Sequence, residues 1–385
     1  MNLQLTNQQK QERTRFREFV DQEIAPHACR FDREEKLPIE LIVKIARQGY
    51  LGSFLGEEWG GRSLDTITYG LLSEEIGRAC SSVRSLLTVH DMVAISVLRW
   101  GSHEQRAKWL PLLVQGKAIA AFAVTEPEAG CDLGCVKTTA VRAGGGYVLN
   151  GVKSWITFGQ VADLFLVLAG LDEKLSAFLV ERNRPGVSTV PISGLLGVRA
   201  SMLAEVRLND CEIPADSIIG QPGFGLASVV ATALGLGRYS VAWGCVGIAQ
   251  ACLESCVKYT NDRKQFGKPL KEHQLIRHMI SDMVVDIKAA RLLCSRAGIL
   301  KQLGDPCEVM ETLIAKYFSS RAAMKSASDA VQIHGANGCG DRYPVQRYMR
   351  DAKIMEIIEG SNQMQQLLIA DYAYQEEARN LSDGD

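Results

Sequence analysis

The spacing of apolar residues along the 385-residue chain divides it into three parts. Up to about residue 120, apolar residues recur every three or four positions, which predicts amphipathic helices. The first stripe consists of Phe16, Phe19, Val20 and Ile24. A second helix is predicted to begin at Pro38 and end at Gly52, and two more are predicted over 67–80 and 103–117.

Near residue 121 the period shortens to that of β-strands, punctuated by Gly, Asn-Asp and Pro. The β-rich runs are 146–170, 175–182, 186–192 and 204–214. After residues 221–225 the helical period returns and continues to the C-terminus. The pattern therefore predicts an α+β, mainly helical fold, with a helical domain over 1–120, a β domain over 121–225 and a helical bundle over 226–385.

The composition is ordinary for a globular protein, with 46% hydrophobic and 23% charged residues. A formal net charge of −1 gives no broad basic surface, so neither nucleic acid nor a membrane is expected as a partner. The N-terminus lacks the apolar core of a signal peptide, and no apolar run reads as long enough to span a bilayer. We therefore expect a cytoplasmic protein.

The eleven cysteines follow no repeating spacing. Cys131 and Cys135 are four residues apart, as are Cys252 and Cys256, but no nearby His or Cys pair completes a zinc site. No metal site is expected, and buried free thiols in a reducing compartment are the simpler interpretation.

Glycine clusters occur at 223–225, 235–238 and 335–340. None has the complete G-x-G-x-x-G pattern between a strand and a helix, so a Rossmann dinucleotide site is not predicted. Each cluster is explained as well by a turn or a tight helix contact.

Two segments of the β domain offer polar or aromatic groups to a ligand. In residues 123–132, the Thr125 hydroxyl and backbone N–H groups could face a polar ligand, although a plain surface loop fits too. Alternation along a strand would place Trp155 and Thr157 on one side, where they suit a planar heteroaromatic ring. By pattern alone, core packing is the simpler explanation of that aromatic residue.

Residues 262–274 form a polar, basic segment between two apolar helices. The segment is either a solvated connection or a ligand site. A ligand site would use Arg263 for a phosphate, Phe266 for stacking and Gln274 for a hydrogen bond. In residues 332–338, Gln332 offers an amide beside a glycine-rich backbone, while His334 is expected to be structural.

Glu359 stands in the sequence MEIIEGSNQ, after two isoleucines and before a glycine. A carboxylate there is costly to bury without a partner or a task. It is either a solvated side chain at a helix end or a base held against apolar groups.

Five segments, in this order, resemble the acyl-CoA dehydrogenase family of flavoproteins. They are TEPEAGCD (125–132), WIT (155–157), DRKQFGKPLKEHQ (262–274), QIHGANG (332–338) and RYPVQRYMRDAKIMEIIEGSNQ (342–363). The resemblance covers essentially the whole chain. It implies an N-terminal helical domain, a β-barrel-like middle domain and a C-terminal four-helix bundle, with extended FAD between the last two and no Rossmann fold.

The resemblance also implies roles for single residues. Thr125, Trp155 and Thr157 would line the flavin ring, and Cys131 would approach the pyrophosphate and the substrate. The residues implied for the rest of the FAD, partly across a subunit interface, are Arg263, Phe266, Gln274, Gln332, Ala336, Ser361 and Gln363. Arg238 would help to hold coenzyme A.

For Glu359 the resemblance implies the general base, which removes the proton α to a thioester while flavin N5 accepts a hydride from the β carbon. Its backbone N–H and a flavin ribityl hydroxyl would polarise the thioester carbonyl. Apolar neighbours such as Ile358 would raise the carboxylate pKa, and Gly360 would let the substrate approach. Some branches place the base just before Arg238, but this chain has Gly237 there, so Glu359 is the base expected.

Four positions depart from the family pattern. Cys131 replaces a common Ser, Ala336 a common Gly and Phe158 a common Asn. Gly235 stands where an Asp usually helps Arg238 to hold coenzyme A, so part of that clamp is missing. A carrier protein shares the phosphopantetheine arm of coenzyme A, so a carrier-bound (hydroxy)acyl group of polyketide or peptide biosynthesis is an alternative substrate.

The expected activity is FAD-dependent α,β-dehydrogenation of an acyl thioester, in a homotetramer or homodimer that passes electrons to an electron-transfer flavoprotein. Retention of Glu359 favours dehydrogenation over relatives that oxidise nitroalkanes or hydroxylate nitrogen. A flavin oxidase or monooxygenase on the same fold is a further alternative. A redox-silent relative that responds to DNA alkylation is disfavoured, because the C-terminal sequence here is acidic.

Overall fold

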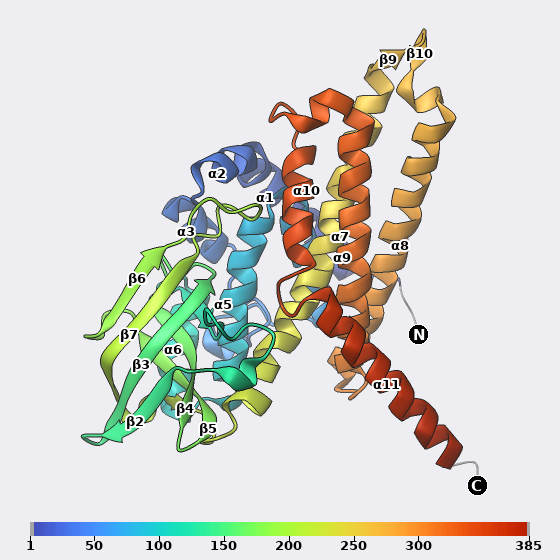
Figure 1. Cartoon of the computed structure of the whole chain (residues 1–385). Coiled ribbons are helices and arrows are strands. Elements are labelled where there is room, and N and C mark those ends of the chain that lie inside the picture. Colours follow the sequence, from blue (N-terminus) through green and yellow to red (C-terminus); the bar gives the residue numbers. More distant parts are fainter. Residues whose placement is uncertain (1–3, 383–385) are drawn as a thin grey trace.

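The computed structural model of the chain describes residues 4–382, with side chains as far as residue 376. Figure 1 shows N-terminal helices, a β domain beside them and a set of long C-terminal helices. This arrangement confirms the predicted α+β, mainly helical fold.

The described residues of the N-terminal part form six α-helices. They are α1 (Asn7–Glu23), α2 (Ala28–Glu34), α3 (Ile39–Arg47), α4 (Thr66–Ala79), α5 (Ser81–Trp100) and α6 (His103–Val114). The predicted stripe of α1 is buried, as expected. The prediction that the second helix continues to Gly52 is wrong. It ends at Arg47 because Gly49 adopts a φ of +68°, which an α-helix does not tolerate.

The β domain is a mixed sheet with the strand order β6-β7-β3-β2-β4-β5-β8, to which β1 adds in parallel beside β4. Its strands are β1 (Ala120–Ala123), β2 (Thr139–Ala143), β3 (Gly146–Ile156), β4 (Leu164–Leu171), β5 (Lys174–Glu181), β6 (Val187–Pro191), β7 (Ala204–Pro214) and β8 (Ile218–Ile219). Alternation along β4 sends Phe165 into the core of the β domain and Leu164 toward Leu110 of α6. The sheet therefore packs one face on the N-terminal helices.

The C-terminal part begins with a π-helical turn (Gly225–Val230) that continues into α7. Its helices are α7 (Ala231–Asp262), α8 (Gln274–Leu303), α9 (Glu308–His334), α10 (Val345–Met355) and α11 (Asn362–Ser382). A hairpin of β9 (Lys264–Gln265) and β10 (Lys268–Pro269) joins α7 to α8 at one end of the bundle (Figure 1). In the same figure, α11 extends away from the other helices.

One helix, Gly225–Asp262, is long and apolar enough to cross a membrane by length and composition. The expectation that no segment meets this criterion is therefore wrong. In this structure 72% of its most apolar window is buried. Such burial is what the central helix of a bundle requires.

The cysteines of the described residues form no disulfide. The buried ones are Cys80, Cys211, Cys245, Cys252, Cys256 and Cys294. The prediction of buried thiols fails for the exposed ones, which are Cys131, Cys135, Cys307 and Cys339. Their segments lie at helix ends and in a loop, where the apolar pattern gives no burial signal. Within residues 4–382, no group of three or more His, Cys, Asp or Glu side chains is placed to hold a metal ion.

Candidate active site

The loop between α10 and α11 carries Glu359 in a strained backbone conformation. Glu359 has a φ of +57° and Gly360 a φ of +86°. A non-glycine residue in the left-handed region costs about 1–2 kcal/mol, so surrounding contacts have to hold it there. Strain of this kind is concentrated at functional sites.

Three side chains hold the loop by its carbonyl oxygens. Arg238 of α7 donates from Nε to the Glu359 carbonyl over 3.1 Å, and Gln365 of α11 donates to the same oxygen over 3.3 Å. Lys316, buried on α9, donates to the Gly360 carbonyl over 2.9 Å. The carbonyls are therefore fixed by three different helices. The Glu359 backbone N–H has no acceptor among the residues that the structure describes.

The carboxylate of Glu359 is withdrawn from water. Its Oε2 atom is buried and has no hydrogen-bond partner within the described part of the chain. Burial raises the pKa of Glu359 above its ordinary value, while the positive charges of Arg238, Arg84 and Lys316 oppose that rise. A desolvated, unpartnered carboxylate is a stronger base than one in water.

Helix α7 packs against this carboxylate at Gly237, which has no side chain. A Cβ built on Gly237 would lie 2.5 Å from Glu359 Oε2 and 2.8 Å from Met92 Sδ. Gly237 therefore leaves the space that Glu359 fills. By contrast, a Cβ on Gly235, two residues earlier, would have no atom within 4 Å.

Gly237→Ala is expected to lower the rate of flavin reduction by about 100-fold, because the added methyl displaces the carboxylate and an error of ~1 Å in a reacting group costs roughly this much. Gly235→Ala adds the same methyl to the same helix in open space and serves as the control. Rapid-mixing measurements on both variants test this. Equal rates for the two would contradict the assigned contact.

The β domain contributes Thr125, Trp155 and Thr157 near the end of β3. Ser154 N–H donates to the Thr125 carbonyl over 2.9 Å, which joins the 124–138 loop to this strand. That strand alternation places Trp155 and Thr157 on one side stays a prediction, because β3 ends at Ile156, before Thr157. The pairing of β3 with β7 is irregular between Lys153 and Ile156, and Trp155 has a φ of +60°. Trp155 is nevertheless 58% exposed, so it is not a core residue.

A buried ion pair shapes the 124–138 loop. Lys153 donates from Nζ to Glu126 Oε1 over 2.7 Å and to the Val124 carbonyl over 3.1 Å. The same carboxylate accepts the backbone N–H groups of Lys137 and Thr138. Burial lowers the pKa of Lys153 to about 8, although its hydrogen bond to Glu126 opposes the fall. Cys131 lies exposed on this loop.

The residues predicted for the other half of the FAD lie elsewhere. Arg263, Phe266, Gln274, Gln332 and Ala336 are all exposed, at the end of the bundle that carries the β9–β10 hairpin. Arg238 and Arg263 are separated by about 37 Å along α7 at a rise of ~1.5 Å per residue. One chain therefore does not bring the two predicted groups together.

The last predicted residues follow Glu359 in the chain. Ser361 accepts a hydrogen bond from the Met364 N–H over 3.4 Å at the start of α11, and Gln363 is exposed in the first turn. Lys316, Gln365 and Arg84 were not predicted from the sequence as residues near Glu359. For Lys316 and Arg84 the available signal was a single charged residue within an apolar helical segment, which is costly to bury. Gln365 lies among polar residues and gave no such signal.

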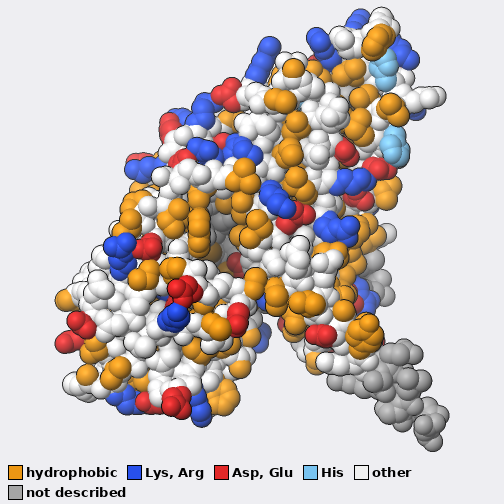
Figure 2. Space-filling view, in the orientation of Figure 1, with side chains coloured by type: hydrophobic (Ala, Val, Ile, Leu, Met, Phe, Trp, Pro, Cys, Tyr) orange, Lys and Arg blue, Asp and Glu red, His pale blue; other side chains and the backbone are white. Residues whose placement is uncertain are grey.

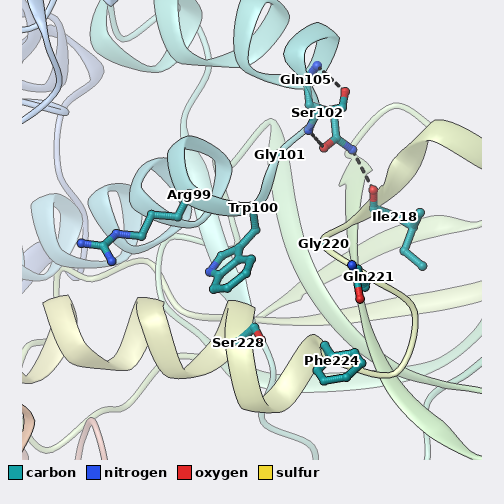
Figure 3. A pocket seen from close by; sticks show the side chains of 10 residues that line it. All are labelled: Arg99, Trp100, Gly101, Ser102, Gln105, Ile218, Gly220, Gln221, Phe224 and Ser228. Carbon is teal, nitrogen blue, oxygen red and sulfur yellow. Dashed lines mark hydrogen bonds between the residues drawn. The ribbon is translucent and has the colours of Figure 1, made fainter. Parts of the chain in front are cut away.

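A separate surface pocket of about 450 Å³ lies between the end of α5 and the π-helical turn before α7. Figure 3 shows Trp100, Gln105, Phe224 and Ser228 among the residues that line it. It contains none of the predicted site residues. Figure 2 shows a further hollow between the β domain and the C-terminal helices, with apolar side chains on its rim.

Comparison with known proteins decides the family. Three family models match in order: the N-terminal domain of acyl-CoA dehydrogenase over residues 6–117, its middle domain over 121–211 and its C-terminal domain over 223–373. This chain belongs to the acyl-CoA dehydrogenase family. The members of this family are FAD-binding oxidoreductases that act on CH–CH groups.

Individual relatives match this chain along nearly its whole length. An acyl-CoA dehydrogenase of Bacillus subtilis is 38% identical over 96% of this chain and 99% of the relative. Butyryl-CoA dehydrogenase from Megasphaera elsdenii is 33% identical, with a TM-score of 0.94 over 97% of this chain and all of that one. A glutaryl-CoA dehydrogenase in complex with glutaryl-CoA is 35% identical, with a TM-score of 0.92 over 96% of each chain.

Two further solved structures are of proteins whose names refer to an acyl carrier protein or to polyketide biosynthesis. The prolyl acyl carrier protein oxidase AnaB is 29% identical, with a TM-score of 0.92 over 96% of this chain and all of its own. FkbI, which serves biosynthesis of a methoxymalonyl extender unit, is 33% identical, with a TM-score of 0.86 over 94% of this chain and 99% of its own. The family therefore does not by itself define the acyl group or its carrier.

The residues present fit FAD. Trp155 and Phe266 are large aromatic side chains that are 58% and 95% exposed, so their ring faces are open to a planar partner. An exposed aromatic plane suits a flavin or an adenine ring. Exposed Arg263 supplies a permanent positive charge for a phosphate.

Proposed function

We propose that this acyl-CoA dehydrogenase catalyses α,β-dehydrogenation of an acyl thioester with Glu359 as the base. The main evidence for this proposal is the environment of Glu359 Oε2. This atom is buried, has no hydrogen-bond partner among the described residues and lies against the backbone of Gly237. A carboxylate held in this way lowers the stability of the fold, and groups of this kind are concentrated at functional sites.

The proposed reaction divides its work among neighbouring groups. Glu359 takes the proton from the carbon α to the thioester. Its own backbone N–H donates to the thioester oxygen as negative charge develops there. Arg238 and Gln365 fix the orientation of that N–H, because both donate hydrogen bonds to the backbone carbonyl of Glu359. When bound, the flavin supplies the acceptor for the hydride from the β carbon.

A second copy of the chain completes the proposed flavin site. The two groups of predicted residues are about 37 Å apart along α7, so one copy contributes the Glu359 end and another the hairpin end. Apolar side chains exposed on α8 and α11 support such an assembly. They are Leu275, Val285, Leu292, Leu303, Leu367 and Tyr374. A homodimer or homotetramer is therefore proposed.

An acyl carrier protein is the second candidate for the acyl carrier. The observation that favours it is Gly235, which faces open space, while Arg238 is engaged with the Glu359 carbonyl. The coenzyme A clamp of the family is thus weakened here. AnaB acts on a carrier-bound group, which makes this candidate chemically reasonable for a relative. Acyl-CoA is the first candidate because most of the similar proteins are acyl-CoA dehydrogenases.

The purified protein is expected to be yellow, with one FAD per subunit. Under anaerobic conditions its flavin absorbance should bleach with acyl thioesters, and an electron-transfer flavoprotein should reoxidise it faster than air does. Matched acyl-CoA and acyl-carrier-protein panels identify the carrier. A colourless protein that takes up no FAD, or a flavin that no acyl thioester reduces, would refute the proposed function. Rapid reoxidation by air would indicate an oxidase instead.

A further inference from the structure

Lys316 of α9 is a buried ammonium group without a carboxylate partner. Its side chain is 0% exposed, and no ion pair within the described part of the chain includes it. The other fully buried lysine, Lys153, is paired with Glu126 over 2.7 Å. An unpaired buried charge lowers the stability of the fold, and perturbed charges of this kind are concentrated at functional sites.

The amine is bound to oxygen atoms of the loop between α10 and α11. Lys316 Nζ donates to the Gly360 carbonyl over 2.9 Å and to Asn362 Oδ1 over 3.1 Å. Ser320, one turn further along α9, also donates to Asn362 Oδ1, over 3.0 Å. Helix α9 packs against both α7 and α11 (Figure 1). Lys316 therefore anchors the residues that directly follow Glu359 to the rigid bundle.

The charge of Lys316 also acts on the Glu359 carboxylate. Burial raises the pKa of Glu359, and the positive charges of Arg238, Arg84 and Lys316 oppose that rise. An arginine stays protonated in proteins, whereas an amine can lose its proton. Burial lowers the pKa of Lys316 to about 8. Lys316 is therefore the member of this trio whose charge changes near neutral pH.

Two further helices present titratable groups to Lys316. The Cys245 thiol of α7 is neutral, because burial raises its pKa to about 12. Arg238, also on α7, disfavours protonation of Lys316. Glu356, at the end of α10, favours it, but this carboxylate is already paired with a lysine of α10 over 2.8 Å. Glu359 is therefore the unpaired anion that responds to the charge of Lys316.

We propose that Lys316 is a positioning residue for Glu359: its ammonium group holds the strained Glu359–Gly360 turn and keeps the carboxylate ionised until it takes the α-proton. The proposal rests on the proposed function, in which Glu359 is the base. A charged donor makes a stronger hydrogen bond to the Gly360 carbonyl than a neutral amine does. Flavin reduction should therefore be fast only between two limbs of the pH profile, an acidic one where Glu359 is protonated and an alkaline one where Lys316 is neutral.

Lys316→Met is expected to lower the rate of flavin reduction about 10–100-fold, the effect of losing one hydrogen bond to a charged group. The acidic limb should move up by about one pH unit, because Glu359 loses a neighbouring cation, and the alkaline limb should disappear. Anaerobic rapid mixing across the pH range measures both, with the acyl thioester that reduces the wild type fastest. Lys325→Met removes an exposed lysine of the same helix, paired with Asp282 over 2.7 Å, and should change neither the rate nor the limbs.

Asn362→Asp keeps the shape of the cluster and places a carboxylate against Lys316, so it serves even if Lys316→Met does not fold. The new charge should raise the pKa of Lys316 and offset its effect on Glu359, which moves both limbs to higher pH. A slower Lys316→Met with unmoved limbs, or an Asn362→Asp with the wild-type profile, would overturn the role of Lys316 and leave the proposed function intact. No reduction of the wild type by any acyl thioester would overturn both.

Discussion

Glu359→Gln is expected to slow flavin reduction by an acyl thioester about 10²–10⁴-fold, the range that a general base contributes. The amide keeps the shape of the side chain and the backbone contacts of Arg238 and Gln365, but it does not accept the α-proton. FAD content and thioester binding should therefore stay at wild-type levels, so the loss appears in kcat. Anaerobic rapid mixing, with the flavin absorbance as the signal, measures it.

The wild-type rate should also depend on pH. Burial raises the pKa of Glu359, so the carboxylate form, and with it the rate, is lost as pH falls through a value above that of an ordinary glutamate. The acidic limb should be absent in Glu359→Gln. Glu356→Gln, on the same turn but paired with Lys353 near the surface, is the control and should react at the wild-type rate. Wild-type flavin reduction in Glu359→Gln would remove Glu359 as the base.

Lys153→Met is expected to lower the free energy of unfolding by about 3–5 kcal/mol, because it leaves the buried Glu126 carboxylate without its cation. Burial by itself would raise the pKa of Glu126, and the hydrogen bonds from Lys153 and Thr138 hold it below its ordinary value instead. The 124–138 loop carries Thr125 and Cys131, so FAD content should fall as well. Denaturant unfolding and the flavin-to-protein absorbance ratio measure the two effects.

Two further variants test whether loss of the Lys153–Glu126 ion pair causes the fall in stability. Lys137→Met removes a lysine whose partner, Glu128, is as exposed as itself, so it should leave stability unchanged. Glu126→Gln combined with Lys153→Met removes both charges and should recover most of the lost stability. The deficit of Lys153→Met should also shrink as pH falls, because protonation of Glu126 neutralises the orphaned charge. A deficit that is the same at every pH, or no deficit, would contradict a buried ion pair.

The order of helices and strands followed from periodicity, and its failures have local causes. The helix over 38–52 ended early because Gly49 leaves the α region, a choice that its backbone freedom allows and hydrophobicity does not record. Alternation of burial breaks just before Trp155, where Lys153 and Ser154 are both buried, because the ladder between β3 and β7 is irregular there. Predictions from periodicity assume a regular backbone, and Gly49 and Trp155 both lie where the backbone is irregular.

The candidate site was found in the sequence wherever its residues are neighbours along the chain. The segment around Glu359 resembled its family directly, because a strained loop at a helix junction restricts several consecutive residues at once. Lys316 and Arg84 were missed because they are single charged residues within apolar helices. Their tasks depend on what faces them from other helices.

The sequence by itself determined the order of the elements and the family and singled out Glu359 as the candidate base, because these depend on local spacing and on contiguous motifs. Only the tertiary structure decided which groups surround that base. It brought the bare backbone of Gly237 against Glu359 and placed the buried Lys316 against the carbonyl of Gly360. It also separated Arg238 from Arg263 by most of the length of α7. Burial, charge pairing and distance arise between segments far apart in the chain, and one-dimensional spacing carries no record of them.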